Sequence, residues 1–264
     1  MPVGFILTSA LGKYKARRIA EGMARSLARS LGVDVEPLLA GSYAELLEAL
    51  DSGQAQIGWC PAAVCTQLES RARGIFPAVR EGVPSYHAAL VGRQDKRLSL
   101  DSLAGTRAAW VDRHSFGGYL LAMEYLQRQR IDPDKTFSSQ TFYGSYPDAV
   151  AAVLEGRAEV SSVTVARTSE AAIVKTMAAL LGPGASRLSV IAVTDSIPAD
   201  ALVVTRHLAP DLAVRAEQAF EQAGPNDPLC EPMACEGYRR ARPGDYKVVA
   251  LTRCLGLIDF HRRF

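Results

Sequence analysis

The sequence lacks any run of about 18 apolar residues, which is the length that a membrane-spanning helix needs. It also lacks a strong charge excess, because 30 Lys and Arg residues stand against 28 Asp and Glu residues and leave a net charge of +2 over 264 residues. Such a small excess does not favour binding to nucleic acid or to an anionic membrane surface. We therefore expect a globular chain with no membrane span and no nucleic-acid partner.

Motifs for catalysis and metal binding are also missing. The chain has no P-loop, no Gly-x-Ser-x-Gly element and no Cys-x-x-Cys pair. The five cysteines do not cluster with the four histidines, so the spacing predicts no metal site, and we expect neither a cofactor nor an enzyme. A Cys230–Cys235 bridge stays open as an alternative to buried free thiols, which we favour.

The beginning of the chain does not have the order of a secretory signal, which places basic residues before its apolar segment. Here the basic residues of positions 13–18 follow the short apolar run of positions 3–7, a pattern typical of a first strand. Two localisations stay open. One is periplasmic or otherwise extracytoplasmic, for a mature chain whose signal is not part of this sequence, and the other is cytoplasmic.

Short apolar runs alternate with amphipathic segments along most of the chain, which predicts an α/β fold with parallel strands covered by helices. Ser42, followed by Glu45, predicts a capping box at one helix start. One such block covers about residues 1–86 and a second about 92–192, and the part after Pro210 is expected to be mainly helical. The expected strands are 2–8, 33–39, 55–60, 85–93, 103–112, 135–143, 158–165, 186–194 and 199–206, and the expected helices are 13–31, 42–50, 62–72, 117–130, 146–156 and 169–181.

The stretch "AWVDRHSFGGYLLAMEYLQRQ" joins an apolar run to a helical pattern through a hydroxyl residue and two glycines. The first N–H groups of a helix have no partner within the helix, so such a junction can hold an anion. The hydroxyl of Ser115 and the N–H groups of Phe116, Gly117 and Gly118 are the candidate donors. The simpler alternative is that Ser115 is an ordinary N-cap and that the glycines only shape the turn.

Five segments in sequence resemble the periplasmic substrate-binding proteins of phosphate, phosphite and phosphonate uptake. They are "SYAELLEALDSGQAQIGWCPAAV", "VPSYHAALVGR", "LAGTRAAWVDRHSFGGYLLAMEYL", "TFYGSYPDAVAAVLEGRAEVSSVTV" and "VIAVTDSIPADALVVTR". The resemblance implies two Rossmann-like lobes of the type II periplasmic-binding fold, joined by a two-strand hinge near 88–93 and 192–197. Lobe 1 would comprise residues 1–88 and 196–264, with the strand 199–206 returning to it, and lobe 2 residues 89–195.

The same resemblance implies a function. The chain would be a monomeric solute-binding protein that closes on a small anion, such as a phosphonate, phosphite or phosphate, and hands it to the permease of an ABC importer. A cytoplasmic sensor of the same fold is the alternative, which the cysteines and the missing signal favour. A third reading, an enzyme on this scaffold, has no catalytic motif to support it.

The resemblance also assigns ligand-binding roles to individual residues. The helix start at Ser115, Phe116, Gly117 and Gly118 matches the element that binds the anionic headgroup, although the family prefers a second hydroxyl where this chain has Phe116. Tyr146 stands where the family usually has His, and Ser162 and Thr164 stand where some members have an acid for an amine-bearing ligand. These departures predict a less charged or more apolar ligand. Tyr43 and Tyr86 match cleft tyrosines, and Trp59, Thr8 and Ser9 are candidates because ligands collect at the carboxyl ends of parallel strands.

Overall fold

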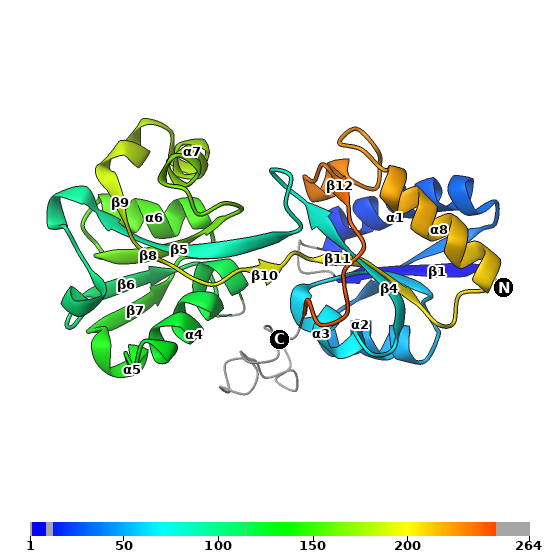
Figure 1. Cartoon of the computed structure of the whole chain (residues 1–264), viewed down its shortest axis with the longest axis horizontal. Coiled ribbons are helices and arrows are strands. Elements are labelled where there is room, and N and C mark those ends of the chain that lie inside the picture. The colour runs from blue at the N-terminus through cyan, green and yellow to red at the C-terminus, as the bar shows by residue number, and fades with distance from the viewer. Residues whose placement is uncertain (1, 9–12, 114, 247–264) are drawn as a thin grey trace. The chain divides into compact units, whose positions relative to one another are not determined.

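The structure is a computed structural model that describes residues 2–8, 13–113 and 115–246 (Figure 1). The described residues divide into two compact units. The first contains those within Met1–Ser85 and Ile197–Arg253, and the second contains those within Tyr86–Ser196. Each unit is an α/β layer structure, so the predicted fold class is confirmed at this level.

The sheet of the first unit has the strand order β12-β4-β11-β3-β1-β2. β1 pairs in parallel with β2 and β3, as predicted, whereas β11 lies antiparallel between β3 and β4. The expected return of the strand near residue 201 to the first sheet is therefore confirmed, but the sheet is mixed rather than parallel throughout. The strands are β1 (Val3–Thr8), β2 (Val35–Ala40), β3 (Ile57–Cys60), β4 (Ala72–Val79), β11 (Ala201–Thr205) and β12 (Gly237–Tyr238).

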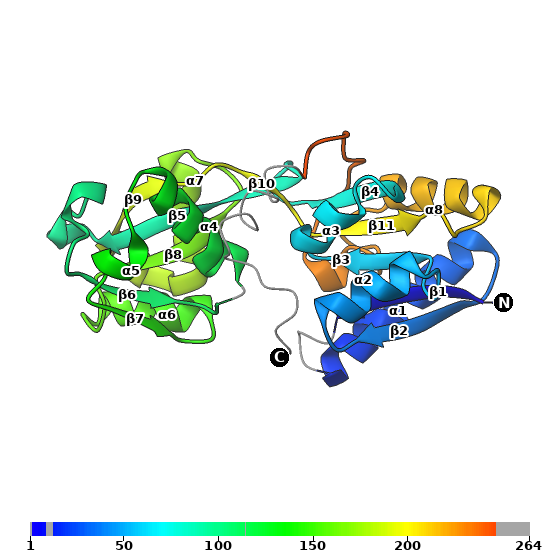
Figure 2. The ribbon, with the colours of Figure 1, turned by 90° about the horizontal axis from the view of Figure 1, so that it is seen from below.

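Helices cover both faces of this sheet. α1 (Lys13–Leu31) and α8 (Pro210–Gln222) pack together on one face, and α2 (Tyr43–Asp51) and α3 (Ala62–Leu68) cover the other (Figures 1 and 2). α1 buries one apolar stripe at helical spacing, because Met23, Leu27 and Leu31 are inaccessible to solvent.

The capping box predicted at α2 forms only in part. The Ser42 hydroxyl accepts a hydrogen bond from the Glu45 N–H at 3.1 Å, as a capping box requires. The Glu45 carboxylate, however, accepts from the N–H of Gly41 at 2.5 Å rather than from that of Ser42. The helix start is capped, but the reciprocal bond reaches one residue further back.

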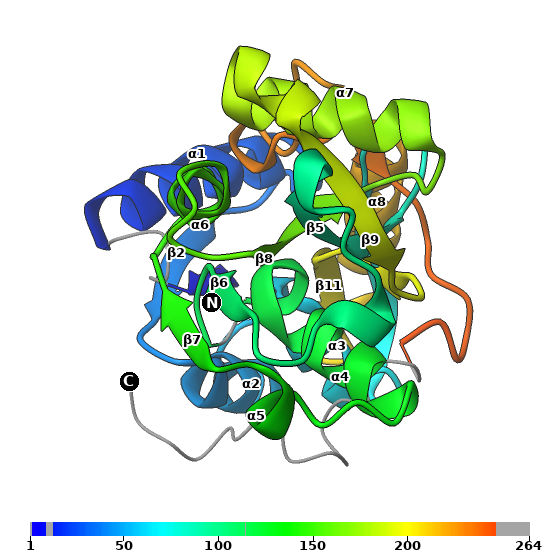
Figure 3. The same cartoon turned by 90° about the vertical axis from the view of Figure 1, so that its left-hand side faces the viewer.

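The sheet of the second unit contains the strand order β5-β8-β6-β7, and β9 pairs antiparallel with β5. α6 and α7 lie on one face, over a core that includes Val163 and Ile173. α4 lies on the other face, over a core that includes Trp110 and Met123 (Figure 3). The elements are β5 (Ser85–Arg93), β6 (Arg107–Trp110), β7 (Ser139–Phe142), β8 (Val160–Val165), β9 (Leu188–Val193), α4 (Leu121–Arg128), α5 (Pro133–Thr136), α6 (Tyr146–Leu154) and α7 (Glu170–Leu181).

One prediction about elements is wrong. Within the described residues, the part after Pro210 is not mainly helical, because α8 ends at Gln222 and is followed by one 3₁₀ turn and β12. The helix expected over about 117–130 is present, and it starts as a π-helical turn, η4 (Phe116–Leu120), before α4 continues it to Arg128. The remaining short elements are η2 (Gln94–Lys96), η3 (Leu100–Ser102), η5 (Gly182–Arg187), β10 (Ile197–Pro198) and η6 (Glu231–Met233).

The four described cysteines are buried free thiols. The preferred interpretation is thus confirmed for Cys60, Cys65, Cys230 and Cys235, and the alternative bridge between Cys230 and Cys235 is wrong. Burial raises the pKa of the Cys230 thiol to about 12, which leaves it an unreactive thiol at neutral pH. The fifth cysteine, Cys254, lies outside the described residues.

Candidate functional site

The strand-to-helix junction after β6 begins at a genuine N-cap. Ser115 has extended backbone angles, and its hydroxyl oxygen accepts a hydrogen bond from the Gly118 N–H at 3.1 Å. The ordinary capping role considered for this residue is therefore present. It does not exclude a ligand, because a serine hydroxyl that accepts one bond can still donate its proton to another oxygen.

The next two N–H groups have no acceptor within the described residues. The first helical bonds of the turn run from Leu120 N–H to the Ser115 carbonyl and from Leu121 N–H to the Phe116 carbonyl. The N–H groups of Phe116 and Gly117 precede these bonds. They lie at the positive end of the continuous helix formed by η4 and α4, where an anion is stabilised.

Gly117 packs directly against two hydroxyl groups from other elements. A Cβ atom at this position would lie 2.0 Å from Oγ1 of Thr164 and 2.9 Å from the hydroxyl oxygen of Tyr146, so no larger residue fits without a shift. Those two hydroxyls bond to each other at 2.6 Å. The hydroxyl of Ser162 donates to the Gly117 carbonyl at 2.7 Å. We call Ser115, Tyr146, Ser162 and Thr164 the hydroxyl cluster.

The strand β8 explains why two of these hydroxyls face the junction. Ser162 and Thr164 alternate with Ser161 and Val163, so the two pairs point to opposite faces of the sheet. Val163 belongs to the core under α6 and α7, whereas Ser162 reaches Gly117 on the α4 side. Ser161 is buried on the other face, and its hydroxyl has no hydrogen-bond partner among the described residues.

Gly118 is also required by its surroundings rather than by its backbone angles. A Cβ atom there would lie 2.5 Å from Cγ2 of Val111 and 2.7 Å from Oγ of Ser115. Neither Gly117 nor Gly118 is among the described residues with positive φ. The two glycines let the helix start approach the protein's own side chains closely.

Two charged residues, Arg113 in the junction and Glu159 just before β8, are engaged with other side chains. The guanidinium of Arg113 lies over the ring of Phe142, 4.5 Å from its centroid. Glu159 forms a 2.5 Å ion pair with Arg107, and this hydrogen bond lowers the pKa of the Glu159 carboxyl. Arg113 therefore stacks on Phe142 in this structure, and Glu159 is paired with Arg107.

The remaining candidates are described within the unit to which each belongs. In the first unit, Trp59 is buried in β3 and contacts the ring of Tyr238 edge-on at 6.2 Å, while Tyr43 is the half-buried first residue of α2. Tyr86 is half-buried near the start of β5. Thr8 ends β1, and Ser9 lies outside the described residues.

One contact that the sequence does not suggest is the cap of α3. The Asp200 carboxylate accepts a hydrogen bond from the N–H of Ala62 at 3.2 Å across 138 positions of sequence. Burial raises the pKa of the Asp200 carboxyl, while the charge of Arg80 and this hydrogen bond oppose the shift. The protein's own acid therefore occupies the start of α3. Among the described residues, no group of three or more His, Cys, Asp or Glu side chains is placed to hold a metal ion.

The comparison with known families decides the family. The profile of the periplasmic substrate-binding proteins of phosphonate ABC transporters matches residues 5–246. The chain belongs to this family. The family serves transport, its members are periplasmic, and its place in an ABC transporter implies a permease and a small ligand. Within the described part of the chain, no helix is both long and apolar enough to cross a membrane.

Solved structures share the fold of this phosphonate-binding family member at low identity. PhnD1 of Prochlorococcus marinus, solved with methylphosphonate, is 14% identical with a TM-score of 0.69, and the match covers 97% of this chain and 98% of the other. A binding protein of an ABC phosphonate transporter from Pseudomonas aeruginosa is 20% identical, with a TM-score of 0.64 and coverage of 96% and 86%. A Xanthomonas citri protein bound to ATP is 18% identical, with a TM-score of 0.70 and coverage of 99% of both chains. No curated protein matches the sequence.

Proposed function

We propose that this chain binds a small phosphonate-type oxyanion at the start of η4 and delivers it to an ABC importer. The observation that carries the proposal is the pair of N–H groups of Phe116 and Gly117, which have no acceptor among the described residues and lie beside the hydroxyl cluster. Membership of the phosphonate-binding family supports an oxyanion as the ligand of that helix start.

The donors of this site suit three oxygens of one headgroup. Ser115 can donate its hydroxyl proton, Phe116 and Gly117 offer two N–H groups, and the Tyr146–Thr164 pair has one proton left after its mutual bond. Ser162 does not count as a donor, because its proton already bonds to the Gly117 carbonyl. We therefore assign Ser162 the role of holding the helix start in place.

The half-buried ring of Phe116 favours a ligand with a small apolar substituent. A phosphonate carries a carbon group in place of the fourth oxygen of phosphate, so an aromatic surface beside the oxyanion favours methylphosphonate over phosphate. An amine-bearing phosphonate is disfavoured, because Ser162 and Thr164 carry no charge and Glu159 is paired with Arg107. The methylphosphonate complex of PhnD1 supports this choice of ligand.

The proposal also covers the location of the protein, its oligomeric state and its mode of action. An extracytoplasmic location, a monomeric state, the absence of catalysis and closure around the ligand follow from family membership and stay predictions. A cytoplasmic sensor is the second candidate. The specific observation that favours it is the set of buried free thiols that includes Cys60 and Cys65, since oxidising compartments rarely leave several thiols unpaired.

A thermal-shift and calorimetric screen tests the ligand. Phosphate, phosphite, methylphosphonate, 2-aminoethylphosphonate, ATP and acetate would be added separately to the purified chain. A ligand that binds only the folded state raises the melting temperature by mass action, and we expect methylphosphonate to give the largest shift. If none of the phosphorus oxyanions raises the melting temperature, the proposal is wrong. If 2-aminoethylphosphonate raises the melting temperature more than methylphosphonate does, the ligand's substituent is not uncharged and that part of the proposal is wrong.

Two variants that each remove one hydroxyl, on opposite faces of β8, test whether the ligand binds at the hydroxyl cluster. Thr164→Val removes one member of the Tyr146–Thr164 pair, whereas Ser161→Ala removes a hydroxyl of the same strand on the opposite face. We expect Thr164→Val to weaken methylphosphonate binding by about 1 kcal/mol and Ser161→Ala to leave it unchanged. Equal affinities for both variants would argue against a ligand at the hydroxyl cluster.

A further inference from the structure

The helix α1 carries an excess of basic residues in a chain that is nearly neutral as a whole. The helix has one acidic residue, Glu21, and no acid in its first turn, while the whole chain has a net charge of only +2. Its six basic residues are Lys13, Lys15, Arg17, Arg18, Arg25 and Arg29.

Five of these basic residues are exposed and lie outside the buried stripe of α1: Lys15, Arg17, Arg18, Arg25 and Arg29. Arg17 forms an ion pair with Glu21 at 3.2 Å. Lys15 and Arg18 are exposed, and within the described residues neither forms an ion pair. Positive potential is therefore available on this side of the helix for a partner of opposite charge.

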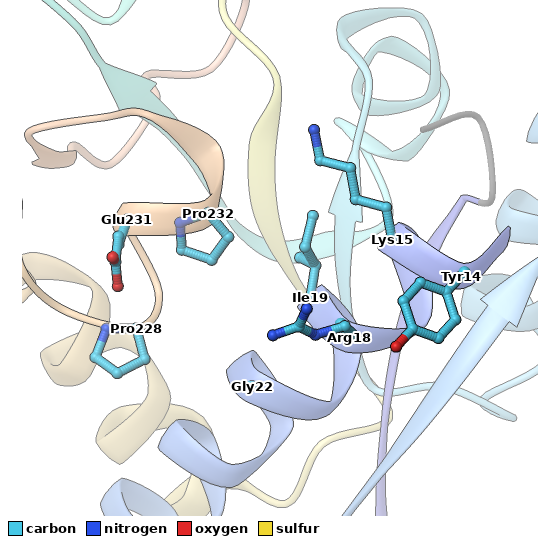
Figure 4. Close-up of a pocket in the computed structure, with 8 residues that line it drawn as sticks. All are labelled: Tyr14, Lys15, Arg18, Ile19, Gly22, Pro228, Glu231 and Pro232. Carbon is cyan, nitrogen blue, oxygen red and sulfur yellow. The ribbon is translucent and has the colours of Figure 1, made fainter. Parts of the chain in front are cut away.

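A cavity of about 400 Å³ opens beside these two cations (Figure 4). Tyr14, Lys15, Arg18, Ile19 and Gly22 of α1 line one side, and Pro228, Glu231 and Pro232 line the other. The guanidinium of Arg18 extends from the helix toward the loop that carries Pro228 and Glu231. The cavity thus combines apolar walls with two cations and one carboxylate, that of Glu231.

Two residues of α1 leave this cavity unfilled and accessible to a partner. A Cβ atom on Gly22 would meet no heavy atom within 4 Å, so the helix leaves empty space where most residues would place a side chain. Tyr14 keeps 79% of its surface exposed, which is unusual for a large ring on a helix that packs on a core. A large exposed ring beside cations is a composition that protein interfaces favour.

We propose that this cavity docks a segment of a partner protein in which acidic residues flank one large apolar side chain. The apolar side chain enters between Ile19 and the two prolines, and the flanking carboxylates pair with Lys15 and Arg18. Charge complementarity supports an acidic partner, because the exposed basic residues of α1 include Lys15 and Arg18, which line the cavity.

Two other anionic partners fit the surface less well. A membrane-binding amphipathic helix inserts its apolar face into lipid, but the apolar face of α1 is buried against its own unit, with Met23 and Leu27 inaccessible. A nucleic acid binds through a row of phosphate contacts, whereas only Lys15 and Arg18 supply cations to this cavity. The observations therefore favour a protein segment.

The test measures binding of two labelled peptides by fluorescence anisotropy. The first is acetyl-Asp-Glu-Trp-Glu-Asp-amide, and the second has Gly in place of Trp. We expect the Trp peptide to bind at least about tenfold more tightly than the Gly peptide, because only the first fills the cavity. Equal binding of the two peptides, or stronger binding to phosphatidylglycerol vesicles than to the Trp peptide, would overturn the proposal.

Three variants of α1 locate the binding. Arg18→Glu reverses a charge at the cavity, and Gly22→Leu fills the cavity while it keeps every charge and improves helix propensity. Each is expected to weaken Trp-peptide binding by about tenfold or more.

Arg17→Glu is the matched charge reversal away from the cavity and should change binding of the Trp peptide by less than about threefold. Wild-type affinity in Gly22→Leu contradicts the proposal. Gly22 belongs to the first unit and is not a member of the hydroxyl cluster, so Gly22→Leu should keep its response to methylphosphonate.

Discussion

The hydroxyl oxygens of Tyr146 and Thr164 lie 2.6 Å apart, and they occupy the space that a side chain at position 117 would need. The contact between this hydroxyl pair and Gly117 holds the start of η4 against α6 and β8. It also brings two hydroxyls next to backbone N–H groups that have no acceptor among the described residues. The proposed oxyanion site is therefore built by tertiary packing around one glycine.

Adding a single methyl group at that glycine is expected to disrupt the site. Gly117→Ala places Cβ within 2.0 Å of Oγ1 of Thr164, so the Tyr146–Thr164 pair must separate. We expect a loss of about 1–3 kcal/mol in the free energy of unfolding and no measurable methylphosphonate binding. Urea denaturation and titration calorimetry measure the two effects.

The matched control for this change is a glycine with open surroundings. Gly22→Ala meets no atom within 4 Å and removes a flexible residue from α1. It should raise the free energy of unfolding by about 0.5–1 kcal/mol and leave methylphosphonate affinity unchanged. A Gly117→Ala variant that is as stable as Gly22→Ala would contradict the close packing described for Gly117.

Removing the tyrosine hydroxyl tests whether the Tyr146–Thr164 pair supplies a proton to the ligand. Tyr146→Phe keeps the ring and deletes one hydroxyl, so Thr164 must bond to the ligand alone. We expect methylphosphonate affinity to fall by about 0.5–1.5 kcal/mol, measured by calorimetry. Tyr119→Phe, which alters a ring packed edge-on against Trp110, is the control and should bind as the wild type does.

The half-buried Asp200 at the start of α3 predicts a pH-dependent stability. Burial raises the pKa of Asp200 above the value of about 3.9 that an unfolded aspartate has. A raised acid pKa contributes stability that is fully present below about pH 4 and is lost as the pH rises through the folded-state pKa. Asp200→Asn keeps an acceptor for the Ala62 N–H but cannot ionise. Its melting temperature should exceed that of the wild type at pH 7, and the difference should shrink toward pH 4.

The control for this pH effect is an exposed aspartate. Asp101 lies in the exposed turn η3, and Asp101→Asn should follow the wild-type melting temperature at both pH values. If Asp200→Asn is less stable than the wild type at pH 7, the carboxylate charge stabilises α3 and the proposed cost of burying it is wrong.

Regular elements with a clear period could be predicted from the sequence. The helical spacing of residues 13–31 and the alternation near Val160 both correspond to observed elements. The strand β4 was not predicted, because "ARGIFPAV" contains Gly74 and Pro77 and shows no clean alternation. β12 is too short, at two residues, to leave any pattern.

The site could be predicted only as a set of separate residues. Ser115 is visible as a helix cap because capping depends on neighbours three positions away. The bond from Ser162 to Gly117 joins residues 45 positions apart, and it decides that Ser162 holds the backbone rather than a ligand. Such a pairing depends on how β8 packs under η4, which local propensity does not encode. The ligand roles of Tyr43, Tyr86 and Trp59 stay predictions.

The most direct test of the account compares wild type with Ser115→Asp in titrations of methylphosphonate. Aspartate is as good an N-cap as serine, so the start of η4 and the melting temperature should be retained. Its negative charge, however, would lie beside the bound oxyanion and repel it. The account predicts binding to the wild type and none to Ser115→Asp. Unchanged affinity in the folded variant would show that Ser115 only caps the helix and that the oxyanion does not bind at this helix start.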